Sequence, residues 1–168
     1  MQLKGEQILP VSQQAAWEAL NDTNLLKEAI PGCESITQST APVDTNGDGA
    51  GDTADVVGVY DLVMVAAVGP VKAKFKGKLQ LMDLDPPHAY TIRFEGSGGI
   101  AGFGKGSAAV KLVPADGETT RLDYEAHATV GGKIAQVGSR LVDMAARKIA
   151  DNFFDNFTEA LKKRQDTH

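Results

Sequence analysis

The segment DTNGDGAGDTAD, residues 44–55, places oxygen atoms at the intervals that a calcium-binding loop uses. If its first aspartate is position 1, side-chain oxygens fall at positions 1, 3, 5, 9 and 12, with glycine at 6 and a backbone carbonyl at 7. The residues at these positions are Asp44, Asn46, Asp48, Ala50 (through its carbonyl), Asp52 and Asp55. Calcium takes six to eight hard oxygens, so the spacing predicts a structural calcium site.

A hairpin turn is the alternative interpretation of this loop. Its Asn-Gly and Asp-Gly pairs adopt the positive φ angles of tight turns, and it lacks the flanking helices of an EF-hand. The run is similar to the aspartate-rich loops of thrombospondin type 3 repeats, which bind calcium without such helices. A bound ion stabilises the folded state, so calcium should raise the melting temperature and Asp48→Ala should abolish the rise. Identical melting curves in calcium and in a chelator would leave the loop as a turn.

Few other side chains have the type and spacing that catalysis needs. The single cysteine, Cys33, excludes an intrachain disulfide and has no metal-ligand spacing around it. The three histidines fall in a DPPH turn, at an outward strand position and at the last residue. The glycine-rich run EGSGGIAGFGKG lacks the third glycine of a dinucleotide fingerprint, and no helix follows it. These residues favour a binding role, and we expect no redox cofactor.

Composition and charge are typical of a single globular domain. The chain has 168 residues, enough for a sizeable core, and its net charge of −5 argues against a nucleic-acid partner. The first ten residues alternate in character instead of forming an apolar leader, and no window is long and apolar enough to span a membrane. We therefore predict one cytoplasmic domain over residues 1–168, with the acidic loop inserted near 40–55.

Turn residues and hydrophobic periodicity predict the elements that surround this loop. A strand over residues 2–9 precedes two short helices, SQQAAWEAL and TNLLKEAI, for which Ser12 and Asp22 are suitable N-caps. Residues 33–130 indicate about six strands separated by turn signals. After Gly131-Gly132 the apolar residues recur at three- or four-residue steps, which predicts one long amphipathic helix.

This order of elements predicts an α+β fold in which an antiparallel sheet of about seven strands wraps around the long C-terminal helix. Alternate residues of a strand face opposite sides, so the inward residues can be identified from the sequence. The inward positions are apolar and include small side chains, which is compatible with close packing or with a cavity. We predict one elongated apolar cavity lined by Tyr60, Leu62, Met64, Phe75, Leu79, Tyr90, Phe94, Tyr124, Leu141, Ala145 and Ile149.

The outward positions of two neighbouring strands carry two rows of like residues. The lysine row consists of Lys72, Lys74, Lys76 and Lys78, and the valine row consists of Val57, Val59, Val63 and Val65. The lysine row is either a solvated face or a docking surface for an acidic partner or anionic lipid. An outward apolar row must be covered, so we expect the valine row in a protein–protein contact, such as a homodimer, or covered by the acidic loop.

Four stretches closely resemble the CoxG (carbon monoxide dehydrogenase G-subunit) family of the SRPBCC superfamily. They read IPGCESI, VGPVKAKFKGKLQLMDLDPPHAYTI, GSGGIAGFGKGSAAVKL and VGGKIAQVGSRLVDMAARKIADNFF. The resemblance runs from about residue 3 to residue 161, interrupted only around 39–55. It implies a helix-grip (START-like) fold with a cavity for a hydrophobic ligand.

The resemblance also implies an accessory role. The protein would hold an apolar molecule, lipid or quinone-like, and help recruit or support a molybdenum hydroxylase of the carbon monoxide dehydrogenase type, by peripheral contact at the inner membrane face. The alternative is a cyclase- or hydrolase-like enzyme that uses the same cavity. An inward Asp, His or Arg would favour the enzyme, whereas Tyr124 is the only polar candidate on an inner face.

Overall fold

The computed structural model describes residues 1–38 and 56–166 of the chain. In chain order the elements are β1 (Gln2–Leu9), α1 (Gln13–Leu20), α2 (Thr23–Ala29), β2 (Cys33–Gln38), β3 (Val56–Val68), β4 (Val71–Asp85), β5 (Ala89–Ser97), the 3-10 helix η1 (Gly99–Ala101), β6 (Phe103–Ala115), β7 (Thr119–Gly131), α4 (Lys133–Gln136) and α5 (Ser139–Asp166). The predicted calcium ligands all lie outside the described residues, so the calcium site stays a prediction.

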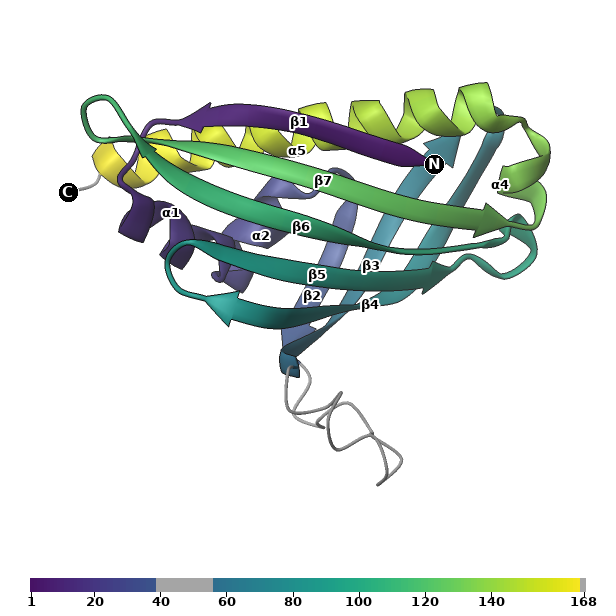
Figure 1. Ribbon diagram of the computed structural model, residues 1–168. Coiled ribbons are helices and arrows are strands. Elements are labelled where there is room, and N and C mark those ends of the chain that lie inside the picture. The colour runs from purple at the N-terminus through teal and green to yellow at the C-terminus, as the bar shows by residue number, and fades with distance from the viewer. Residues whose placement is uncertain (39–55, 167–168) are drawn as a thin grey trace.

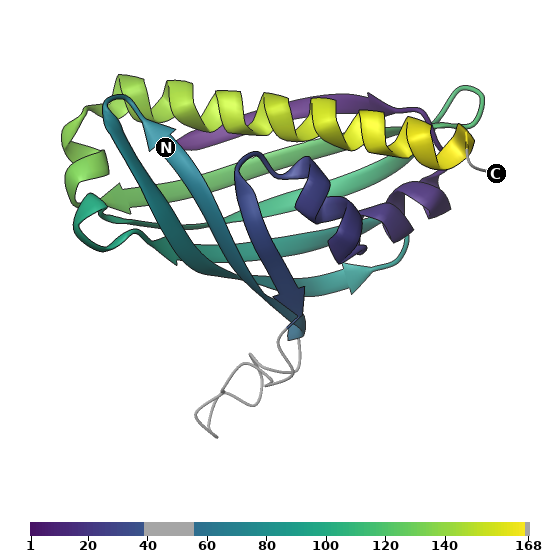
Figure 2. The same ribbon diagram turned by 180° about the vertical axis from the view of Figure 1, so that it is seen from behind.

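Seven strands form one antiparallel sheet in the order β1-β7-β6-β5-β4-β3-β2. Figures 1 and 2 show α5 running lengthwise across one face of this curved sheet, with α1 and α2 covering the same face near the C-terminal end of α5. The predicted α+β helix-grip architecture is confirmed, including the two short helices after the first strand.

The two short helices begin at the residues that the sequence indicates. The Ser12 hydroxyl accepts a hydrogen bond from the Ala15 amide at 3.3 Å, and the Asp22 carboxylate accepts one from the Asn24 amide at 2.9 Å. Each bond satisfies an amide that has no partner within its helix. The caps therefore place α1 and α2 directly after β1, beneath the end of α5.

The C-terminal helix differs from the prediction at its start. Instead of one continuous helix after Gly132, the chain forms the short α4 and then α5. Gly138 separates them with a φ of 103°, a backbone conformation that residues with a Cβ rarely adopt. No helix in the described part of the chain is long and apolar enough to cross a membrane.

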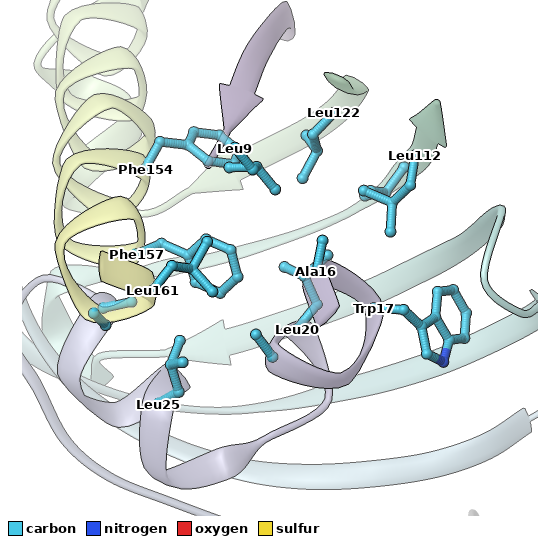
Figure 3. Packing of buried hydrophobic residues seen from close by; sticks show 14 of the residues in the cluster. Leu9, Ala16, Trp17, Leu20, Leu25, Leu112, Leu122, Phe154, Phe157 and Leu161 are labelled. Carbon is cyan, nitrogen blue, oxygen red and sulfur yellow. The ribbon is translucent and has the colours of Figure 1, made fainter. Parts of the chain in front are cut away.

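The main hydrophobic core lies at one end of the molecule, where α1, α2 and the C-terminal half of α5 meet. Figure 3 shows Phe157 and Leu161 of α5 pointing toward Leu20 and Leu25 of the short helices. All four side chains are buried, and Phe157 is fully enclosed. We call this region the packed end. The inward side chains farther along the sheet are less buried, and a cavity begins there.

Candidate functional site: an apolar cavity beneath the long helix

A cavity of ≈ 410 Å³ lies between the inner face of the sheet and α5. Its volume is within the range of small-molecule sites. Every side chain that lines it is apolar or a tyrosine, and among the described residues of the lining none is charged. The lining consists of Met1, Leu3, Leu20, Leu26, Ile30, Pro31, Tyr60, Met64, Leu79, Leu81, Tyr90, Ile92, Phe94, Ala108, Val110, Leu122, Tyr124, Ala126, Ala128, Ala146, Ile149, Ala150, Phe153 and Phe154.

The structure places most of the predicted strand residues in this lining. Tyr60, Met64, Leu79, Tyr90, Phe94 and Tyr124 line the cavity, as does Ile149 of the helix. Leu62 packs against the main core instead. Phe75 lies beside the turn that follows β5, where a Cβ added to Gly98 would come within 2.7 Å of its ring.

Leu141 and Ala145 do not line the cavity, and helix geometry explains the difference. Residues spaced by four advance about 40° around a helix beyond one full turn. The predicted row therefore spirals from the solvent side toward the sheet and reaches the cavity only at Ile149. Leu141 is 37% exposed and lies beside the β3–β4 turn, 3.1 Å from a Cβ built on Gly69.

The helical wall is instead formed by Ala146, Ile149, Ala150 and Phe153, with Phe154 beside them. These positions follow the core face of α5, because Phe154, Phe157 and Leu161 are buried on it. The sequence contained this signal, since extending the apolar spacing backward from Phe153 and Phe157 leads to Ala146, Ile149 and Ala150. The contributions of α2 and of Met1 had no such signal, because they depend on where the chain ends meet in space.

The cavity exists because both of its walls carry small side chains. Ala108, Ala126 and Ala128 line it from the sheet, and Ala146 and Ala150 line it from the helix. Alanine methyl groups on both sides cannot fill the distance between a sheet and a helix.

Burial along the strands shows the same change from a filled to an open interior. On β5, Tyr90 at the packed end is buried, whereas Phe94 farther along is only half-buried. On β7 the same change occurs from Leu122 to Ala128. The inner face is thus packed at one end and lines open space beyond it.

Three tyrosines are the only polar groups of the lining among the described residues. Burial raises the pKa of the Tyr90 and Tyr60 hydroxyls. The pKa of Tyr124 is raised first by burial and then by Asp151, while Arg147 opposes the rise. All three therefore remain neutral hydrogen-bond donors at physiological pH.

The other candidate groups for catalysis lie apart from the cavity. The Cys33 thiol is half-buried, and burial raises its pKa despite the nearby Lys27, which does not favour a thiolate nucleophile. His88 is exposed beside Gln13, with 3.2 Å between Nδ1 and Nε2 of the glutamine. His127 is on the outer face, 3.6 Å from Glu125. Within residues 1–38 and 56–166, no cluster of three or more acidic, histidine or cysteine side chains could hold a metal ion.

The lysine row faces outward as predicted, but acidic neighbours balance part of its charge. Lys74 pairs with Glu34 at 3.0 Å, and both side chains are about half exposed. Lys78 stands between Asp61 of β3 and Glu95 of β5 in the sheet register. Cross-strand neighbours of opposite charge attract one another. Lys72 and Lys76 have no acidic residue opposite them among the described strand pairs.

The valine row also faces outward. Val59 is already buried within the chain, and Val63 and Val65 are half-buried opposite Lys76 and Lys74. The Val57 side chain lies outside the described part. The homodimer contact stays a prediction, and it would depend on the half-buried valines.

Comparison with solved structures supports the architecture. A conserved protein from Geobacillus kaustophilus superposes with a TM-score of 0.81 at 26% identity, covering 97% of this chain and 96% of that one. The Zhui aromatase/cyclase from Streptomyces sp. R1128 gives 0.66 at 12% identity, with 98% and 94% covered. Ara h 8.0201 gives 0.59 at 17% identity, with 96% and 98% covered. The last two likenesses concern the fold alone.

The sequence comparisons identify the family. No curated protein matches the chain. The model of the CoxG family, the G-subunit family of carbon monoxide dehydrogenase, matches residues 49–162, more than half of the chain. This range includes β3 to β7 and most of α5, which provide the sheet and the helical wall of the cavity. The chain therefore belongs to the CoxG family of carbon monoxide dehydrogenase.

Proposed function

We propose that this protein is an accessory carrier that holds an apolar small molecule, such as a lipid or a quinone-like molecule, in the cavity beneath α5. The observation that carries the proposal is the ≈ 410 Å³ cavity whose lining holds no charged side chain among the described residues. Apolar surface that leaves water for such a site gains roughly 25 cal/mol per Å². A hydrocarbon chain or ring system therefore suits the site better than a polar metabolite does.

The test is to identify what the protein carries in its own host. Native mass spectrometry of protein purified from that host should give a mass above that of the chain, and solvent extraction should release one class of apolar molecule. The same protein refolded after extraction should have the mass of the chain alone and take up the extracted molecule again. A native sample without any bound mass that also fails to take up apolar molecules would overturn the proposal.

Family membership supports the second part of the proposal, that the carrier helps recruit or support a molybdenum hydroxylase of the carbon monoxide dehydrogenase type at the membrane. Contact would be peripheral. Lys72 and Lys76 are the members of the lysine row best suited to an acidic protein surface or an anionic lipid, because they lack acidic cross-strand neighbours among the described pairs.

Reversing these two charges should weaken binding to anionic vesicles or to the purified hydroxylase. Each lysine near an anionic bilayer contributes about 1 kcal/mol, so Lys72→Glu with Lys76→Glu should lower affinity at least tenfold, and added salt should reduce the difference. A matched control is Lys4→Glu with Lys111→Glu, an equal change of net charge at exposed positions of β1 and β6. Equal losses in both double variants would assign the effect to net charge and not to this surface.

An enzyme of the cyclase or hydrolase class is the second candidate, because the Zhui aromatase/cyclase shares the fold. Within the described lining, the tyrosine hydroxyls are the only groups that could transfer a proton. Their raised pKa values make them weak acids at neutral pH, which disfavours rapid proton transfer. Turnover of a polyketide or ester by the purified protein, lost on Tyr124→Phe, would support the enzyme instead.

A further inference from the structure

Tyr90 is a polar group that the apolar cavity does not need for packing alone. Its side chain is 5% exposed and lines the cavity at the packed end. The indole of Trp17 holds its ring edge-on, with 5.4 Å between ring centroids and 88° between planes. Two-sided packing of this kind fixes the direction in which the hydroxyl points.

The Tyr90 hydroxyl has no hydrogen-bond partner among the described residues. Its oxygen donates no hydrogen bond to a described group and accepts none from one. Yet no described side-chain oxygen is both fully enclosed and unpaired. The oxygen must therefore border free space, and the space that Tyr90 lines is the cavity. Buried hydroxyl groups in folded proteins normally have a partner, so this one is available to a ligand.

The charge of the lining restricts what that ligand can present. A tyrosine hydroxyl could pair with a neutral carbonyl or with a carboxylate. No described lining residue is cationic, so a carboxylate placed there would lose its hydration without a counter-charge. A neutral acceptor loses much less on leaving water. The site therefore suits a carbonyl oxygen better than the head group of a free fatty acid.

We propose that Tyr90 donates a hydrogen bond to a neutral acceptor oxygen, such as a ketone or ester carbonyl, at the deepest end of an otherwise apolar ligand. This inference rests on the proposed carrier function and adds a rule for which apolar molecules are held in one orientation. Burial raises the pKa of Tyr90 and keeps its proton in place, so the hydroxyl acts as a donor across the physiological range.

The test compares probes of equal chain length that differ only at one end: a long-chain methyl ketone, the corresponding terminal alkene and the corresponding fatty acid. Their affinities are measured by displacement of a neutral apolar fluorophore from wild type, Tyr90→Phe and Tyr124→Phe. Tyr124 is the matched control because it loses the same hydroxyl at another point of the lining, where its ring stacks on Phe154 at 5.2 Å. Wild type should bind the ketone about tenfold more tightly than the alkene, the effect of one hydrogen bond.

Tyr90→Phe should remove this preference for the ketone and leave alkene binding unchanged, and Tyr124→Phe should keep the preference. The phenylalanine ring retains the contact with Trp17, so equal melting temperatures would show that the variant is folded. If ketone and alkene bind wild type equally, or if the fatty acid binds most tightly, the inference is wrong while the carrier function stands. If Tyr124→Phe alone removes the preference, the assignment to Tyr90 is wrong. If no probe displaces the fluorophore, the carrier function itself fails.

Discussion

Replacing Ala108 with phenylalanine is expected to abolish binding of apolar ligands while leaving the protein folded. Ala108 is on β6, is half-buried and lines the cavity opposite the alanines of α5. A phenyl ring at this position would occupy space that the ligand needs. We expect affinity to fall by at least about a hundredfold, or roughly 2.7 kcal/mol. Because the ring fills a void, stability should change little or rise by about 1 kcal/mol, as cavity-filling substitutions commonly do.

The neighbouring residue provides the control. Ala109 follows Ala108 on the same strand but faces outward and is exposed. Ala109→Phe therefore adds the same ring to the opposite face of the sheet, where it should leave ligand affinity unchanged. Fluorophore displacement measures affinity, and thermal unfolding measures stability. Unchanged affinity in Ala108→Phe, with the melting temperature preserved, would mean that ligands do not enter this cavity.

The sheet side of the cavity was predictable because a strand repeats every two residues. One well-defined strand, with lysines alternating against apolar residues over 71–81, determines which face is inward, and the antiparallel register extends that parity to its neighbours. Tyr60, Tyr90 and Tyr124 were assigned to the interior on this basis, and all three line the cavity.

The helical side was harder to predict because its period is not a whole number of residues. A row chosen at four-residue steps drifts around the helix, so an error at Leu141 corrects itself only after two further turns. The break at Gly138 adds to this difficulty, since it resets the phase between α4 and α5. A row anchored on the aromatic residues at the packed end, such as Phe153 and Phe157, would have identified the correct face.

Charge balance on the outer face also could not be seen along one strand. Lys74 and Lys78 form part of a uniform row in the sequence, but their acidic neighbours Glu34, Asp61 and Glu95 come from three other strands. Whether a strand carries a net charge depends on which strands flank it. The strand order of the sheet therefore decides which lysines remain suited to docking.

The contrast between a packed end and an open cavity predicts unequal costs for removing two large side chains of the same helix. Phe157 is fully enclosed in the main core, and its ring stacks on Phe153 with 5.6 Å between centroids. Phe157→Ala should cost about 3–5 kcal/mol, the usual result of removing an enclosed aromatic ring. Domains of this size have a total stability of about 5–15 kcal/mol. The melting temperature should therefore fall by roughly 10 °C.

Ile149→Ala, about two turns earlier on α5, should cost only about 1 kcal/mol in the ligand-free protein. Ile149 is half-buried and borders the cavity, so part of its surface has no packing partner to lose. Chemical denaturation of ligand-free samples measures both values. With a ligand bound, the side chain gains contacts, so the cost of Ile149→Ala should rise while that of Phe157→Ala stays the same. Equal costs for the two substitutions without ligand would mean that the interior beneath α5 is packed along its whole length, and the space on which the carrier function depends would not exist.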